Sequence, residues 1–217
     1  MGTITRSFAN NITTSGILLP ASLNNASLTN VTAYNASVAT GNMVLISSQT
    51  ANNSASITFT SGINSTYKEY QFWFIDIHSR TDTVSFGFNG STDGGSNYNV
   101  TKTTTVFEAY NLETPTSSAL GYEGGSDLAQ STSNQILCIN NGNGADESNS
   151  GYLSLFNPAS TTYVKHFISV SNANSASNYC INDFVAGYMN TTSAVNAVRF
   201  QMSSGNFDGT ILMYGIK

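Results

Sequence analysis

The stretch Val84-Ser85-Phe86-Gly87-Phe88 alternates large apolar side chains with small ones, with a period of two residues. Ile57-Thr58-Phe59-Thr60 repeats the alternation. Because successive side chains of a strand point to opposite faces, this period is typical of an antiparallel strand with one buried face. No window of the chain keeps an apolar helical stripe for three turns without Gly or β-branched residues interrupting it. The pattern therefore predicts strands rather than helices.

Outward from these stretches, turn residues separate short apolar or alternating runs. Asn89-Gly90, Asp93-Gly94-Gly95 and Asp208-Gly209 carry the chemistry of tight turns. About twelve short strands with regular turn signals predict an all-β fold, an antiparallel β-sandwich most similar to a jelly roll. The predicted strands are 43–47, 55–60, 70–78, 83–88, 98–102, 105–110, 135–139, 152–156, 164–170, 184–189, 195–202 and 210–216.

The run Gln71-Phe72-Trp73-Phe74-Ile75-Asp76-Ile77 is apolar at positions of both parities. A strand that is apolar on both faces is expected in the middle of a sheet. We therefore predict a central strand here, with Trp73, the single tryptophan of the chain, in the most buried strand.

The composition excludes several classes of protein. Only 9% of the 217 residues are charged, the net charge is -5, and Ser, Thr and Asn together make up 84 residues. The seven scattered cations form no basic stripe, which excludes a nucleic-acid-binding surface. No apolar run reaches the ~18 residues of a membrane span, and no secretory signal is expected. The 23 Phe and Tyr residues, in regular clusters, argue against disorder.

The first forty residues differ from the rest of the chain. They are rich in Asn, Ser, Thr and Ala, carry no charge after Arg6, and show neither alternation nor a helical stripe. We predict an N-terminal arm or anchor over 1–40 and a β-sandwich domain over 41–217. The alternative is that the segment packs back on its own domain. The expected interface residues of the arm are its apolar cluster, Ile17, Leu18, Leu19, Pro20 and Leu23.

The two cysteines, Cys138 and Cys180, allow one disulfide at most. Both have apolar neighbours, so the preferred interpretation is two small buried side chains, and pairing is left open. With only two histidines and no CxxC spacing, no zinc site is expected. The oxygen-rich loop over 140–150 lacks the pattern of an EF-hand and is interpreted as a solvated loop. No metal and no cofactor is therefore expected.

Catalytic patterns were sought among the acids and histidines. Only Asp76 and Glu108 fall inside predicted strands, and a pair of carboxylates is the minimum for glycoside hydrolysis. The preferred interpretation of Asp76 is a structural ion pair with Arg80 or Lys165. The elbow motif of hydrolases and the nucleotide-binding glycine loops are absent. The sequence therefore predicts no catalytic residue and a protein that is not an enzyme.

The end of the chain carries a resemblance to a known group of proteins. An apolar-Arg-aromatic run (Ala197-Val198-Arg199-Phe200), a Ser203-Ser204-Gly205-Asn206 turn and a last strand beginning Gly209-Thr210 resemble the C-terminus of small structural proteins of tailed bacteriophages. Residues 43–50, 59–67 and 152–158 are similar to the same group of marine-phage virion proteins. The similarity spans roughly residues 40–217.

This resemblance implies a non-enzymatic protein on the exterior of a virion, made in the host cytoplasm. It further implies a homotrimer whose partners are itself and the major capsid or tail proteins, with no nucleic acid and no membrane insertion. The leading expectation is a capsid decoration protein anchored through its N-terminal arm. The alternatives are a tail or neck fibre that recognises host-surface glycans and, third, a carbohydrate-active enzyme that uses Asp76 and Glu108.

Overall fold

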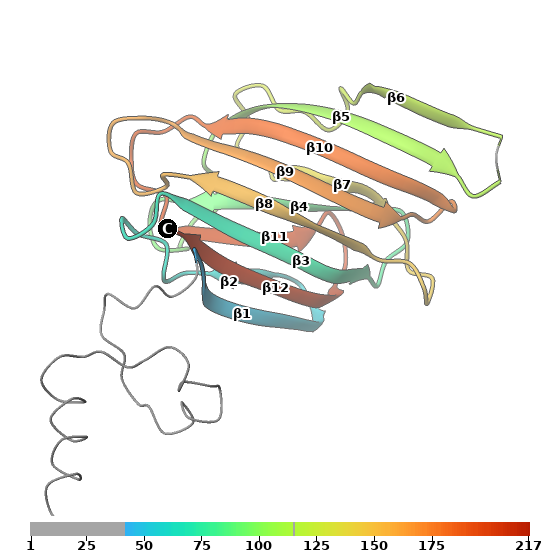
Figure 1. The fold of residues 1–217 in the computed structure, drawn as a ribbon, viewed down its shortest axis with the longest axis horizontal. Helices are drawn as coiled ribbons and strands as arrows, with labels where there is room; N and C mark the ends of the chain where they lie inside the picture. The colour runs from blue at the N-terminus through green and yellow to red at the C-terminus, as the bar shows by residue number, and fades with distance from the viewer. Residues whose placement is uncertain (1–41, 115) are drawn as a thin grey trace, which may run out of the picture. The chain divides into compact units, whose positions relative to one another are not determined.

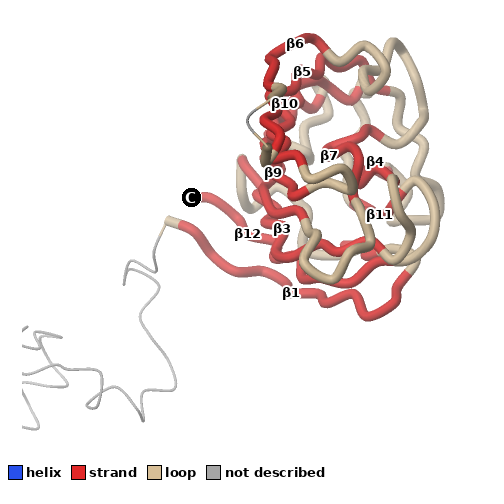
Figure 2. Tube along the Cα trace, turned by 90° about the vertical axis from the view of Figure 1, so that its right-hand side faces the viewer, coloured by secondary structure: helices blue, strands red, loops and turns tan. Residues whose placement is uncertain are grey.

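The computed structural model describes residues 42–114 and 116–217. These residues form twelve strands in two antiparallel sheets and contain no helix. The sheets pack face to face (Figures 1 and 2), which confirms the predicted β-sandwich. The strands are β1 Met43–Ser54, β2 Ile57–Phe59, β3 Glu69–Ser79, β4 Val84–Ser91, β5 Lys102–Leu112, β6 Ser118–Tyr122, β7 Gln135–Asn141, β8 Asn149–Phe156, β9 Lys165–Asn174, β10 Tyr179–Met189, β11 Ala197–Met202 and β12 Phe207–Ile216.

The order of the strands is that of a jelly roll with additions. The larger sheet has the order β1-β12-β3-β8-β9-β10-β5-β6, and the smaller sheet has the order β2-β11-β4-β7. Eight strands, grouped as β1-β12-β3-β8 and β2-β11-β4-β7, give the two facing four-stranded sheets of a jelly roll. The antiparallel pairs β5-β6 and β9-β10 extend the larger sheet to eight strands.

Two points of the strand prediction need correction. Residues 98–101 form no strand, and β5 begins at Lys102. The short strand β6 was not predicted, because all five of its residues are exposed and no buried face imposes an alternation. β6 is a strand only through its backbone pairing with β5.

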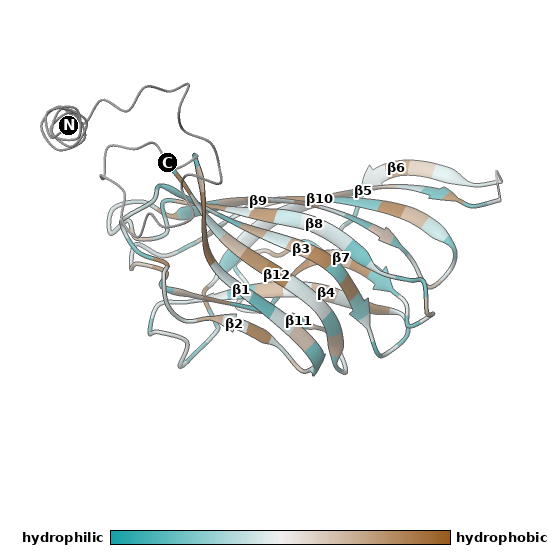
Figure 3. Cartoon of the chain, turned by 60° about the horizontal axis from the view of Figure 1, so that its bottom comes forward, coloured by the Kyte–Doolittle hydropathy of each residue, from teal (hydrophilic) through white to brown (hydrophobic). Residues whose placement is uncertain are grey.

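The core between the sheets is rich in phenylalanine. Along the strands of both sheets, apolar segments alternate with polar ones (Figure 3), and the inward set meets in the middle of the sandwich. Phe200 of β11 is fully buried at the centre of this set. Its ring centroid lies 5.3–6.3 Å from the centroids of the rings of Phe59, Phe72, Phe74, Phe86 and Phe88. Because these rings come from both sheets, Phe200 joins the two layers.

We expect Phe200→Ala to destabilise the protein by about 3–5 kcal/mol, because it removes a buried ring from contact with five others. Urea unfolding followed by circular dichroism measures the change. Tyr163→Ala is the matched control, since Tyr163 is 69% exposed and its loss should change stability by less than about 0.5 kcal/mol. Equal effects of the two changes would contradict this account of the core.

Candidate functional site

The outer face of the larger sheet carries a row of apolar and aromatic side chains that runs across the strands. In register, Leu212 of β12 lies beside Trp73 of β3, which lies beside Tyr152 of β8 and then Val170 of β9. The row continues through Phe184 of β10 and Phe107 of β5 to Tyr122 of β6. We call these seven residues the outer row. Each is half-buried or exposed, whereas their neighbours along the strands, such as Phe72, Leu153 and Val106, point into the core.

The sequence suggested that Trp73 lies in a strand buried on both faces. In the structure, one face of that strand is open. β3 is an interior strand of the larger sheet, as predicted, but Trp73 is 39% exposed and Ile75 is 40% exposed. The reason is that the smaller sheet covers only one face of the larger one, and among the described residues no element covers the other (Figure 2). Apolar residues at both the odd-numbered and the even-numbered positions of β3 thus mark one buried face and one open face.

The rings of the outer row are held in place by their neighbours. The rings of Phe107 and Phe184 are stacked with centroids 5.0 Å apart, and those of Trp73 and Tyr152 lie 5.8 Å apart at a tilt of 35°. The Trp73 indole Nε1 donates a hydrogen bond of 2.8 Å to Gln71 Oε1. Cross-strand aromatic pairs of this kind stabilise a sheet and restrict ring motion. The exposed rings are accordingly preorganised.

The positions that flank the outer row carry no charge. On one side, cross-strand partners run from Leu45 through Tyr214, Gln71, Ser154, Ile168 and Ala186 to Thr105. On the other side, they include Thr50, Thr210, Ile75, Asn172, Asn182, Ala109 and Leu120. None of these residues is ionisable at neutral pH. The larger sheet thus offers a wide face that is apolar along its centre and uncharged beside it, except at the bulge of β3, where Asp76 is exposed next to Ile75.

A hollow adjoins this face where β8, β9, β10 and β5 run side by side. It has a volume of about 480 Å³, and the residues around it include Phe156, His166, Ile168, Tyr188 and Thr105. A second hollow of about 560 Å³ shares Phe156 and His166 and reaches Tyr163. A concave surface with apolar walls and a few hydroxyl and imidazole groups suits a small neutral ligand.

Two carboxyl groups lie beside each other on the inner face of the strands β5 and β10, which extend the larger sheet. Asp183 of β10 pairs across the strands with Glu108 of β5. Asp183 is 1% exposed, and its Oδ2 accepts a hydrogen bond of 3.0 Å from the backbone N–H of Ile139. Burial, with the charge of Glu108 as a lesser cause, raises the pKa of Asp183 to about 7, and burial also raises the pKa of Glu108. Sequence reasoning missed Asp183 because it began this strand at Phe184.

The structure does not unite Asp76 with Glu108. Their strands, β3 and β5, are separated by β8, β9 and β10, which places them about 19 Å apart at the usual strand spacing. That separation is too long for the paired carboxylates of a glycosidase, which lie roughly 5–9.5 Å apart. The pair of Asp183 and Glu108 is closer, but only Glu108 lines a hollow, a third one of about 210 Å³ beside Tyr110 and Ile139, while Asp183 is enclosed. Neither pair forms an open catalytic site.

Asp183 should make the stability of the protein depend on pH. Its folded pKa of about 7 lies above its usual value of 3.8, so the folded state binds a proton that the unfolded state releases. Stability should therefore fall as the pH rises from about 4 to about 7, on the order of a few kcal/mol at about 1.4 kcal/mol per pKa unit. Asp183→Asn keeps an acceptor for Ile139 and should flatten this dependence in urea unfolding at a series of pH values.

The control for the change in net charge is Asp146→Asn, which removes a carboxyl from an exposed loop. It should retain the slope of the unaltered protein. A slope unchanged by Asp183→Asn would show that Asp183 is not the group responsible.

Two lysines are fully buried in the same half of the sandwich. Lys102 and Lys165 both lie beside Met189 of β10, in register on either side. Lys102 Nζ donates to Asn89 Oδ1 at 2.6 Å and to the carbonyl of Val100 at 2.7 Å. Burial lowers the pKa of Lys102 to about 7 and also lowers that of Lys165. Lys165 Nζ donates to the carbonyls of Tyr163 and Thr191 at 2.9 and 3.0 Å, so neutral oxygens, rather than the acid expected for Lys165, hold both amino groups.

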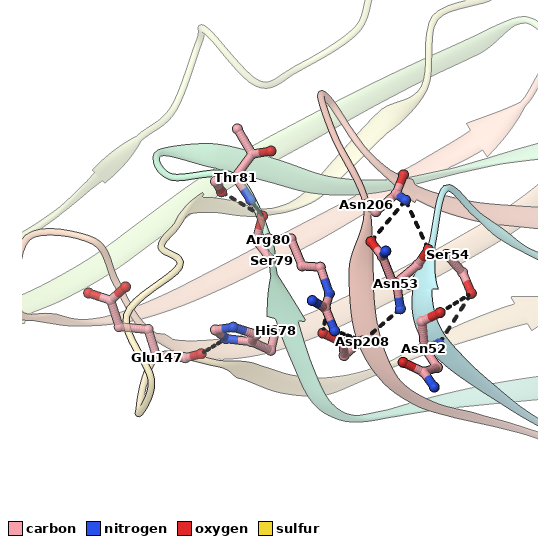
Figure 4. Close-up of polar contacts among 10 residues, drawn as sticks. All are labelled: Asn52, Asn53, Ser54, His78, Ser79, Arg80, Thr81, Glu147, Asn206 and Asp208. Atoms are coloured by element: carbon pink, nitrogen blue, oxygen red, sulfur yellow. Dashed lines mark hydrogen bonds and ion pairs between the residues drawn. The ribbon is translucent and has the colours of Figure 1, made fainter.

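A polar cluster ties the ends of β1, β3 and β12 together (Figure 4). Arg80 forms an ion pair of 2.8 Å with Asp208, and the backbone N–H of Asn53 donates to the same carboxylate at 2.7 Å. Arg80 therefore pairs with Asp208. The sequence had suggested Asp76 as its partner, and this expectation is wrong. Asp76 is exposed at a bulge with φ of 50°, next to Gly209, where a Cβ would lie 2.6 Å from the Asp76 carbonyl oxygen. The cluster stabilises irregular strand ends.

Removing Asp208 should cost more stability than removing Arg80. Arg80→Ala loses an exposed ion pair, which we expect to contribute about 0.2–1 kcal/mol. Asp208→Ala also leaves the Asn53 N–H without its acceptor, adding about 1 kcal/mol. Thermal unfolding of both variants measures the difference, and Asp208→Asn, which keeps an acceptor, should lie between them. An Arg80→Ala variant as unstable as Asp208→Ala would contradict this account.

The cysteines and the oxygen-rich loop form no site in the described residues. Cys138 is buried as predicted, but Cys180 is exposed on the outer face, which corrects the prediction for that residue, and both thiols are free. In the loop over 140–150, Glu147 Oε2 accepts a hydrogen bond of 2.6 Å from the N–H of Gly144. No group of three or more His, Cys, Asp or Glu within 42–114 and 116–217 could hold a metal ion. The same residues contain no helix able to cross a membrane.

The predicted arm over 1–40, with Ile17, Leu18, Leu19, Pro20 and Leu23, lies outside the described residues. Comparisons with protein-family models, with curated proteins and with solved structures found no match to this chain. Functional inference therefore starts from the fold and from the outer row.

Proposed function

We propose that the protein is a non-enzymatic structural component of the exterior of a tailed-phage virion, and in the first place a capsid decoration protein. The observation that carries the proposal is the outer row on a broad, uncharged sheet face. An exposed apolar patch of this extent is typical of a surface that contacts another protein. The jelly-roll order of the strands supports the proposal, because viral coat proteins use this architecture repeatedly.

Composition agrees with a role in assembly. Contacts made by apolar and amide groups are screened by salt far less than contacts between exposed charges. A chain with only 9% charged residues therefore suits association in media of varying ionic strength. In this proposal residues 1–40 anchor the protein to the head, and the described sandwich forms the outward body.

The test uses purified virions. Gold-labelled antibody against the sandwich should decorate the head. A chain lacking residues 1–40 should fail to bind heads that are free of the native protein, whereas the full chain restores occupancy. Label confined to the tail would refute capsid decoration, and undiminished occupancy by the truncated chain would refute the anchor.

The second candidate function is a tail or neck fibre that recognises host glycans, and two features of the structure support it. Trp73 is 39% exposed and so is accessible to a sugar, and the hollow beside His166 and Tyr188 could accept a sugar ring. Against it, the rings of Phe107 and Phe184 stack on each other, so each covers one ring face that a sugar would need. Label on the tail, together with loss of host adsorption in His166→Ala, would favour this alternative.

A further inference from the structure

We infer that the outer row is an interface between two copies of this chain, which pack their larger sheets face to face. This inference deepens the proposed function, because the same outer row carries that proposal, and its test uses the free protein so that the two can fail separately. Three features of the face support it: its area, its lack of charge and the central position of Val170.

The area of the face is sufficient for a stable dimer. Eight strands at about 4.8 Å spacing span about 34 Å, and three rows of side chains on one face cover a width of about 20 Å. The product, on the order of 700 Å², approaches the roughly 800 Å² that each partner buries in a standard interface. Ile168, Phe107, Tyr122 and Leu120 are between 44% and 71% exposed, so this area is free in a single copy.

The distribution of charge favours a second copy over a charged partner. Each chain carries a net charge of -5, so two copies repel each other over most orientations. The outer row and the cross-strand pairs that flank it contain no ionisable group at neutral pH; Asp76 lies beside Ile75 at the bulge of β3, and Glu69 and Asp208 lie farther out. Face-to-face contact therefore places no like charges opposite each other at its centre.

The outer row also has a centre suited to two-fold symmetry. Val170, its fourth member, is flanked by two rings on each side, Tyr152 and Trp73 toward β3, and Phe184 and Phe107 toward β5. A two-fold axis between the packed sheets can bring one row opposite the other in two ways. The axis runs either parallel to β9, the strand of Val170, or parallel to the row itself. In both cases Val170 of one copy faces Val170 of the second copy, and rings face rings. Sheets packed in this way lie about 10 Å apart.

The single tryptophan makes dimerisation directly measurable. Because Trp73 belongs to the outer row, its fluorescence should shift to the red on dilution of the full-length protein, at the concentration where sedimentation shows dissociation. Phe107→Lys should raise the dissociation constant at least tenfold, since it places two cations in the contact. Tyr163→Lys is the matched control, as Tyr163 is 69% exposed outside the row. Circular dichroism should show both variants folded.

A second measurement does not depend on a destabilising change. In a Cys180→Ser background, Val170→Cys should be cross-linked between copies by a bis-maleimide matched to the roughly 10 Å spacing of packed sheets. Asn143→Cys, in the exposed loop between β7 and β8, should not.

Several results would overturn the inference. A monomer at all concentrations with unchanging Trp73 emission would mean that residues 1–41 of the same chain cover the row, or that nothing does. A trimer without cross-linking at Val170→Cys would place the self-contact elsewhere. A monomer whose Trp73 emission shifts on titration with a neutral polysaccharide would assign the row to glycan.

Discussion

The packing of Phe200 against rings from both sheets is the contact on which the rest of the structure depends. Phe59, Phe86 and Phe88 belong to the smaller sheet, and Phe72 and Phe74 to the larger one, so a single side chain of β11 touches both layers. With the two layers fixed at this point, every strand of the jelly roll has one face toward the core. The opposite face of the larger sheet is then free for other contacts.

Strand periodicity predicted much of this arrangement. The alternation in Ile57 to Thr60 and Val84 to Phe88 located two core strands and the architecture correctly, because burial of one face imposes period two on a sequence. Period two says nothing about which strands are neighbours, so the row that joins Trp73 to Phe107 could not be read from the sequence. β6 was missed for a related reason, since an exposed strand has no buried face to reveal it.

The candidate site was less accessible to sequence reasoning than the fold. Trp73 was taken to be buried because an apolar strand has the same pattern whether its second face contacts its own core or stays open for another molecule. Asp183 was placed outside its strand because an ionisable residue interrupts an apolar pattern, although burial and a backbone N–H from Ile139 accommodate it. In both cases the tertiary surroundings, rather than the local pattern, decide the environment of the side chain.

The two inserted strand pairs, β5-β6 and β9-β10, have a further consequence for how such a protein can change. They double the width of one sheet while the eight jelly-roll strands keep their order. Tyr152, Trp73 and Leu212 of the outer row come from the jelly roll, and the other four members come from the insertions. Substitution of the outward-facing residues of these strands should thus alter partner specificity over half of the contact face, while inward-facing residues such as Phe167 and Val185 keep their place in the core.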